Sequence, residues 1–159
     1  MLRINPIRRR HAPTQYAHCC GRRNRSSVRS RRQGRTSSPE APDKAKAVYH
    51  LTDYDKVNFV LGNIKNHYQG VGGPDKVTIA LVVHGSALKA FHTASTTPWT
   101  VHQTDELSKS GLQLNACVNT MRSQNVSMKD LVPGFVVAER GGVVRIAELQ
   151  SQGYVYLRP

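Results

Sequence analysis

The sequence predicts a three-layer α/β/α sandwich built on a mostly parallel, five-stranded sheet. Short segments rich in β-forming residues alternate with segments of helical apolar period over residues 46–159, and this alternation is typical of βαβ units. One of these segments, residues 76–83, is apolar almost throughout. Such a run indicates a strand that is buried on both faces of a parallel sheet, with helices covering both sides.

The five predicted strands are separated by glycine, proline and polar residues. They cover residues 46–52, 76–83, 112–117, 135–138 and 154–157. The first helix has the clearest pattern, because apolar residues recur on one face at helical period and Gly70 ends it. That face consists of Val57, Val60, Leu61, Ile64 and Tyr68.

Shorter helices are expected in the remaining connections, with a loop over residues 96–101. They cover residues 86–93, 104–109, 118–124, 127–131 and 142–152. The last of them should direct Val143, Ile146, Ala147 and Leu149 toward the sheet. Strands and helices in this order form a flavodoxin-like domain of the α/β class, complete within residues 46–159.

Charge is divided unequally along the chain. The 159 residues carry a net charge of +13, but residues 1–46 hold +11 of it and residues 47–159 only +2. The predicted domain is therefore nearly neutral, which excludes a uniformly basic nucleic-acid-binding domain and makes a nucleic-acid partner the least favoured interpretation. The longest aliphatic run, Ile79 to Val83, is far shorter than the ~20 apolar residues of a membrane helix.

Residues 1–45 form a separate, arginine-rich segment. Within residues 1–39 there are eleven arginines and no lysine, aspartate or glutamate, and the sparse apolar residues show no period. A segment of this composition does not bury enough apolar surface to offset the entropy lost on ordering. We interpret it as disordered.

Four explanations of this segment are open. Arg8, Arg9 and Arg10 resemble a twin-arginine export signal, but no apolar stretch follows them. The composition fits a transit peptide, although its glycine and proline clusters fit an amphipathic helix poorly. A nucleic-acid-binding arm would place guanidinium groups on phosphates. The abrupt change in composition near Glu40 favours the fourth, a translation start or frame foreign to the protein, which peptides from residues 1–35 of the native protein would contradict.

Three residues are candidates for catalysis. Open parallel sheets place their sites beyond the carboxyl ends of the strands, where His50, His84 and Cys117 are expected. Cys117 ends a strand and begins a helix, and the free N–H groups there favour the thiolate. A lone strand cysteine is also often inert packing, so a buried residue, a reactive thiol and a ligand completed by distant residues all stay open.

Polar residues near Cys117 are candidates for substrate binding. Asn119 and Thr120 follow it at the start of the helix, where they bind an anion or simply cap the helix. Arg122, about one turn further on, adds positive potential to the site or is simply solvated. No Cys-x-x-Cys or Cys/His zinc spacing occurs, so no metal site is expected. Gly141 and Gly142 precede the last predicted helix and form either an anion-binding turn or a plain turn.

The predicted domain resembles the DsrE/DsrF-like family of small sulfur-relay-type proteins. The resemblance lies in residues 57–64, 77–85, 111–121 and 133–142. The third stretch, Gly-Leu-Gln-Leu-Asn-Ala-Cys-Val-Asn-Thr-Met, is the most specific, because it places Cys117 at the family's strand-to-helix position. His84 lies in the second stretch, without a role that the family assigns. The arginine-rich segment has no counterpart in the family pattern.

The resemblance implies an α/β/α fold, assembly into homo- or hetero-oligomers, and transfer of persulfide sulfur between partner proteins through Cys117. It implies sulfur donor and acceptor proteins as partners and requires no metal or organic cofactor. The alternative is a non-catalytic oligomeric binding or scaffold protein with an inert, buried Cys117. The chain as written predicts a cytoplasmic protein, and a different N-terminus bearing an export signal would make it periplasmic.

Overall fold

The computed structural model describes residues 44–159, which contain a five-stranded sheet in the order β4-β3-β2-β1-β5. All four neighbouring strand pairs are parallel. The strands are β1 (Ala45–Leu51), β2 (Val77–Val83), β3 (Gln113–Cys117), β4 (Phe135–Ala138) and β5 (Val155–Leu157). Each lies within one residue of its predicted bounds. The predicted disordered segment, residues 1–45, lies outside the described residues apart from Lys44 and Ala45.

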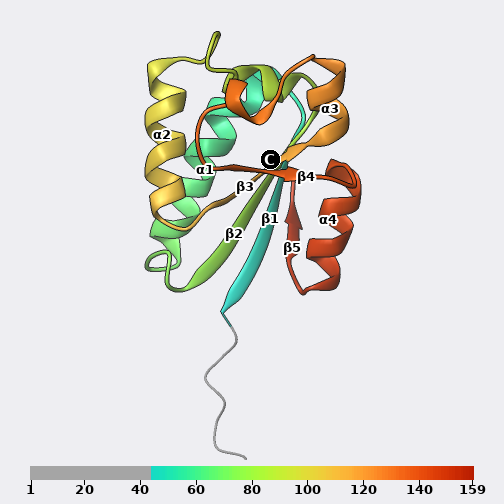
Figure 1. Cartoon of the computed structure of the whole chain (residues 1–159). Helices are drawn as coiled ribbons and strands as arrows, with labels where there is room; N and C mark the ends of the chain where they lie inside the picture. Colours follow the sequence, from blue (N-terminus) through green and yellow to red (C-terminus); the bar gives the residue numbers. More distant parts are fainter. Residues whose placement is uncertain (1–43) are drawn as a thin grey trace, which may run out of the picture. The chain divides into compact units, whose positions relative to one another are not determined.

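Helices cover both faces of the sheet, which confirms the α/β three-layer fold (Figure 1). The α-helices are α1 (Val57–Gly70), α2 (Pro98–Lys109), α3 (Val118–Ser123) and α4 (Gly142–Ser151). Three short 3-10 helices lie in the connections, η1 (Tyr54–Lys56), η2 (Gly85–Phe91) and η3 (Met128–Asp130). The larger core cluster lies on the side of α1, and α4 covers the opposite face.

The predicted loop over residues 96–101 is wrong, because α2 begins at Pro98 and not at residue 104. Thr97 caps this helix, with its side-chain oxygen accepting the N–H of Thr100 at 3.1 Å. Proline fits the first helical position, since its fixed φ suits the helix and no N–H is needed there. The pair Thr97-Pro98 was therefore a sequence signal for the start of this helix.

The apolar face of α4 also differs from the prediction. Ile146 and Leu149 are buried against the sheet, but Val143 is 69% exposed and Ala147 is exposed too. The buried residues of α4 are Gly142, Ile146 and Leu149, a single narrow stripe at helical spacing. The stripe is narrow because α4 meets only the sheet. Val143 and Ala147 lie beside it and face outward.

Within residues 44–159, no helix combines the length and the apolar character that crossing a membrane requires.

Candidate functional site

The carboxyl ends of the strands place several polar side chains on the face of the sheet that α4 covers. Val48 and Val82 belong to the core beneath α4. Because strand side chains alternate between faces, His50 and His84, each two residues further along, lie on that same face. Tyr156 is the register partner of Val48 and joins them there.

Cys117 lies at the junction of β3 and α3, as the N-cap residue of the helix. Its side chain is buried, with 6% of the residue exposed. The sulfur accepts a hydrogen bond from the backbone N–H of Gly142, the first residue of α4, over 3.1 Å. The N-termini of α3 and α4 therefore both lie next to this sulfur.

These surroundings lower the pKa of the Cys117 thiol. Burial alone raises the pKa, because it disfavours the charged thiolate. Hydrogen bonds from Thr120, Gly142 and Asn119 act against it, since N–H and O–H donors stabilise negative sulfur, and together they outweigh burial. The geometry therefore favours a nucleophilic thiolate at a position that is largely closed to solvent.

Gly142 separates Cys117 from His84. A Cβ atom on Gly142 would lie 3.3 Å from Cβ of Cys117 and 3.2 Å from Cδ2 of His84. Both distances are shorter than ordinary van der Waals contacts. A larger residue here would require a shift of a few tenths of an ångström, so glycine suits the position, and both candidate residues lie close to it.

His50 and His84 form a hydrogen-bonded chain with Tyr156. The two Nε2 atoms are 2.5 Å apart while the ring centroids are 4.6 Å apart, so the imidazoles meet tip to tip. Nδ1 of His50 then lies 2.6 Å from the hydroxyl of Tyr156. The three side chains come from β1, β5 and the residue that follows β2, and they lead from Gly142 toward the sheet edge.

Both imidazoles favour their neutral form. Burial, His84 and Arg158 lower the pKa of His50 to about 4, against an opposing effect of Asp53. Burial and Arg158 lower the pKa of His84, again opposed by Asp53. At neutral pH both imidazoles are therefore uncharged, and the same shifts make them weaker bases than an ordinary histidine.

This pair makes the domain less stable in mild acid. Histidine in an unfolded chain titrates near 6.5, so between pH 6.5 and about 4 the unfolded chain binds more protons than the folded one. We expect the urea midpoint to fall as the pH is lowered from 7 to 5. This drop in the midpoint should be smaller in His50→Asn than in the wild type. In His102→Asn, a matched control at an exposed histidine, the drop should equal that of the wild type. Equal falls in all three proteins would contradict this assignment.

The candidate binding residues have different surroundings. The Thr120 hydroxyl accepts the N–H of Gly85 at 3.1 Å and also hydrogen-bonds Cys117. Asn119 supplies a backbone N–H to Cys117, and its Nδ2 would lie 3.0 Å from a Cβ on Gly141. Arg122 is exposed, and its side chain forms no hydrogen bond or ion pair with another residue between 44 and 159. Thr120 and Asn119 therefore surround the sulfur, whereas Arg122 does not.

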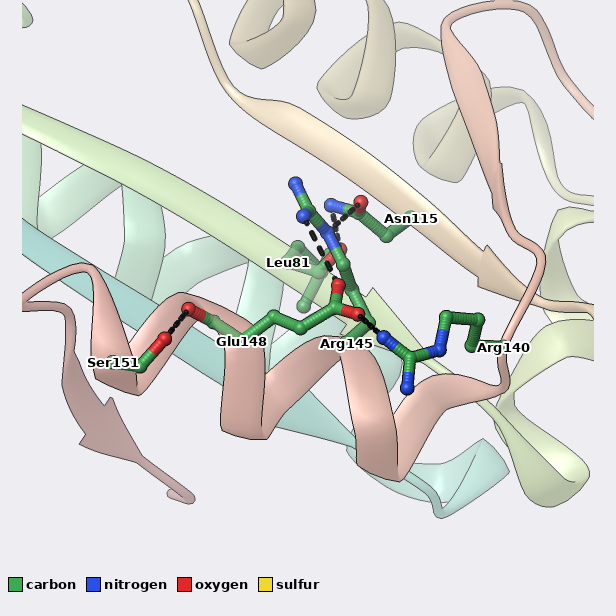
Figure 2. Close-up of polar contacts among 6 residues, drawn as sticks. All are labelled: Leu81, Asn115, Arg140, Arg145, Glu148 and Ser151. Carbon is green, nitrogen blue, oxygen red and sulfur yellow. Dashed lines mark hydrogen bonds and ion pairs between the residues drawn. The ribbon is translucent and has the colours of Figure 1, made fainter.

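A network of charged and polar side chains connects α4 to Asn115, which lies two residues before Cys117 on β3 (Figure 2). Asn115 is 4% exposed, and its Oδ1 accepts the Nε–H of Arg145 at 3.0 Å. Glu148 pairs with Arg145 at 3.6 Å and with Arg140 at 3.0 Å. Sequence reasoning missed this network and Tyr156, because no local pattern joins residues 30 or 106 positions apart.

The donor role of Gly142 was missed as well, although the Gly141-Gly142 pair before a helix was a signal for it. Among residues 44–159 there is no cluster of three or more His, Cys, Asp or Glu side chains with the arrangement of a metal site. The described part of the chain thus offers a cysteine near His84 and, on the same face of the sheet, a network of Asn115, Arg145 and Glu148.

The chain matches no family model and no curated protein. It is similar to a solved structure of a protein of unknown function from Methanobacterium thermoautotrophicum, with 26% sequence identity and a TM-score of 0.63. The similarity covers 72% of this chain and 99% of that chain. The similarity supports the fold of the domain. Because that protein has no assigned function, the comparison assigns no activity to this chain.

Proposed function

We propose that the domain is a sulfur-carrier or sulfurtransferase-like protein that accepts and passes on persulfide sulfur at Cys117. The observation that supports this most directly is the set of donors around the Cys117 sulfur, above all the Gly142 N–H at 3.1 Å. A sulfur carrier needs a thiolate in its empty state and a stabilised anionic sulfur in its loaded state. Hydrogen-bond donors at the start of two helices serve both states.

The transfer needs no oxidant, because sulfur moves between thiols. The Cys117 thiolate attacks the outer sulfur of a donor persulfide, R–S–SH. A sulfur–sulfur bond forms to Cys117, the donor's own sulfur–sulfur bond breaks, and the donor leaves as R–S⁻. The proton stays on the transferred sulfur. An acceptor thiolate then attacks that sulfur in the same way and releases Cys117 as thiolate.

His84 and His50 are proposed as the groups that take the proton when the Cys117 thiol ionises. One feature supports this role: His84 and Cys117 both lie close to Gly142. The lowered pKa of both imidazoles means that they would hold such a proton only transiently. The tip-to-tip contact gives the proton a way from His84 to His50. Metal ions and organic cofactors have no part in this chemistry.

The resemblance to DsrE/DsrF-like proteins points to the same function. The α/β/α fold agrees with what that resemblance implies, and Cys117 occupies the strand-to-helix junction where the family carries its cysteine. Sulfur donor and acceptor proteins are the proposed partners, and a homo- or hetero-oligomer is the proposed assembly.

One observation favours a second candidate, an oligomeric binding or scaffold protein with an inert cysteine. Cys117 is only 6% exposed, and a donor must reach its sulfur. Alkylation of the native protein separates the two candidates. An inert cysteine reacts at a rate governed by unfolding, whereas a carrier reacts in the native state and faster than an ordinary thiol at pH 6.

Incubation with a persulfide donor tests the proposed function. We expect the peptide that contains Cys117 to gain one sulfur atom, about 32 Da, and to lose it again to an acceptor thiol. Cys117→Ser should abolish this gain and leave the fold intact. Cys19 and Cys20 provide thiols of the same chain for comparison. An unmodified Cys117 beside a donor that loads free thiols would rule the function out.

A further inference from the structure

A hollow of about 320 Å³ lies on the α4 face of the sheet, over β3 and β4. Its walls include Asn115, Val136, Ala138, Gly141, Arg145 and Glu148. The volume is at the lower end of the roughly 300–1,000 Å³ that ligand pockets in proteins occupy, which suits a small ligand. Neither the proposed sulfur transfer nor the histidine pair uses this hollow.

Cys117 does not itself line the hollow, but three of the lining residues are close neighbours of Cys117 or of the glycine that donates to it. Ala138 is the register partner of Cys117 in the neighbouring strand. Gly141 directly precedes Gly142, whose N–H donates to the sulfur. Asn115 lies two residues before Cys117 on β3, so both side chains are on the α4 face. The hollow is therefore near Cys117, on the side away from β2 and His84, and a ligand bound in it would have to extend past these residues to meet the sulfur.

Arg145 is held in this hollow by buried groups. Its Nε–H donates to Oδ1 of Asn115, while Nδ2 of Asn115 donates to the carbonyls of Leu81 at 3.4 Å and Gln113 at 3.2 Å. Glu148 lies 3.6 Å from Nη1, and the arginine side chain remains 30% exposed (Figure 2). A guanidinium carries five N–H donors, so most of them remain for a ligand.

Net charge does not make the hollow attractive to anions. Arg140 and Glu139 also line it, so the four charged side chains cancel. Glu148 shares its carboxylate between Arg140 and Arg145. What distinguishes the site is a guanidinium fixed in position, and a planar, preorganised guanidinium binds a carboxylate through paired hydrogen bonds.

We propose that this hollow binds the carboxylate of a small thiol persulfide, with Arg145 as its recognition residue, and so presents the outer sulfur to Cys117. This inference rests on the proposed sulfur-carrier function and adds the class of donor. The Cys117 thiolate bonds to the outer sulfur, the donor's sulfur–sulfur bond breaks, and the small molecule departs as a thiolate with its carboxylate. The proton remains on the transferred sulfur.

The test compares two donors that differ only in charge, N-acetylcysteine persulfide and N-acetylcysteine amide persulfide. The rate at which each one loads Cys117 in the full chain is measured by mass spectrometry of the peptide that contains Cys117. We expect the carboxylate donor to react about tenfold or more faster, since hydrogen bonds to charged groups have this effect. The comparison needs no substitution, so folding of a variant does not limit it.

Arg145→Gln should remove this preference, so that the two donors load Cys117 at similar rates. Lys109→Gln is the matched control, because it removes one positive charge from α2, whose Leu107 packs in the core on the other face of the sheet. Equal rates of the two donors with the wild-type chain, or a preference that survives Arg145→Gln, would overturn the inference and leave the proposed function standing. Loading by neither donor would overturn the inference as well, and the proposed function would fall with it only if a protein persulfide also left Cys117 unmodified.

Discussion

Replacing Gly142 with alanine is expected to slow alkylation of Cys117 at pH 7 about threefold to tenfold. The new methyl group would lie 3.3 Å from Cβ of Cys117 and 3.2 Å from Cδ2 of His84, so these side chains or the start of α4 must shift by a few tenths of an ångström. We expect this shift to lengthen and weaken the N–H···S hydrogen bond. Such a bond to a charged group contributes about 1.5–3 kcal/mol, and weakening it raises the pKa of the thiol.

The effect on the rate is smaller than the weakened hydrogen bond alone implies. A thiolate of higher pKa is rarer at pH 7 but more nucleophilic, with a Brønsted slope of about 0.4–0.5, so roughly half of the change cancels. The measurement is the pH profile of alkylation by iodoacetamide, followed at Cys117 by peptide mapping. For Gly142→Ala this profile should shift to higher pH.

Gly62→Ala is the control for this experiment. Gly62 lies within α1, and a Cβ atom there would meet nothing within 4 Å. Alanine at an open helical position should raise stability by about 0.5–1 kcal/mol, because it restricts the unfolded chain. It should leave the alkylation profile of Cys117 unchanged. A profile that is the same in Gly142→Ala and the wild type would show that the Gly142 N–H has no part in activating the thiol.

Replacing Phe91 with alanine is expected to lower the free energy of unfolding by about 3–5 kcal/mol. The Phe91 side chain is fully buried in η2, and its ring meets the edge of Phe135 at a centroid distance of 5.2 Å. A domain is typically stable by only about 5–15 kcal/mol, so this loss is a large share of the total.

Urea denaturation measures this loss as a lower midpoint with an unchanged slope. Phe91→Leu keeps most of the buried volume and should cost clearly less than Phe91→Ala. A loss below about 1 kcal/mol in Phe91→Ala would mean that the surrounding core closes over the cavity. Because η2 directly follows His84, we also expect weaker sulfur uptake in Phe91→Ala even when the chain is folded.

The strands were predictable because the chain signals them locally. The run in β2 and the glycines and prolines between segments fix their bounds to within one residue. The start of α2 was missed because Pro98 looks like a loop residue unless it is considered together with the capping Thr97. The outward positions of Val143 and Ala147 depend on how much of α4 the sheet covers, which no local pattern contains.

The candidate site was predictable only in part. The carboxyl ends of the parallel strands place His50, His84 and Cys117 at one edge of the sheet, and the alternation of strand side chains places them on one face. Their contacts depend on the sheet order and on Gly142, since adjacent strands bring the imidazoles together and the start of α4 reaches the sulfur. The Asn115–Arg145 pair depends on α4 docking over β3, which single-residue patterns do not encode.

The pairing of β1 with β5 sets the order in which the site is completed during synthesis. The hydrogen bond between His50 and Tyr156 joins residues 106 positions apart. On a growing chain, β1, β2 and β3 emerge first and Cys117 follows them, so the thiol exists before its most distant neighbour is made. The histidine pair gains its tyrosine only when residue 156 has left the ribosome, so the thiol is made well before the hydrogen-bonded chain beside it is complete.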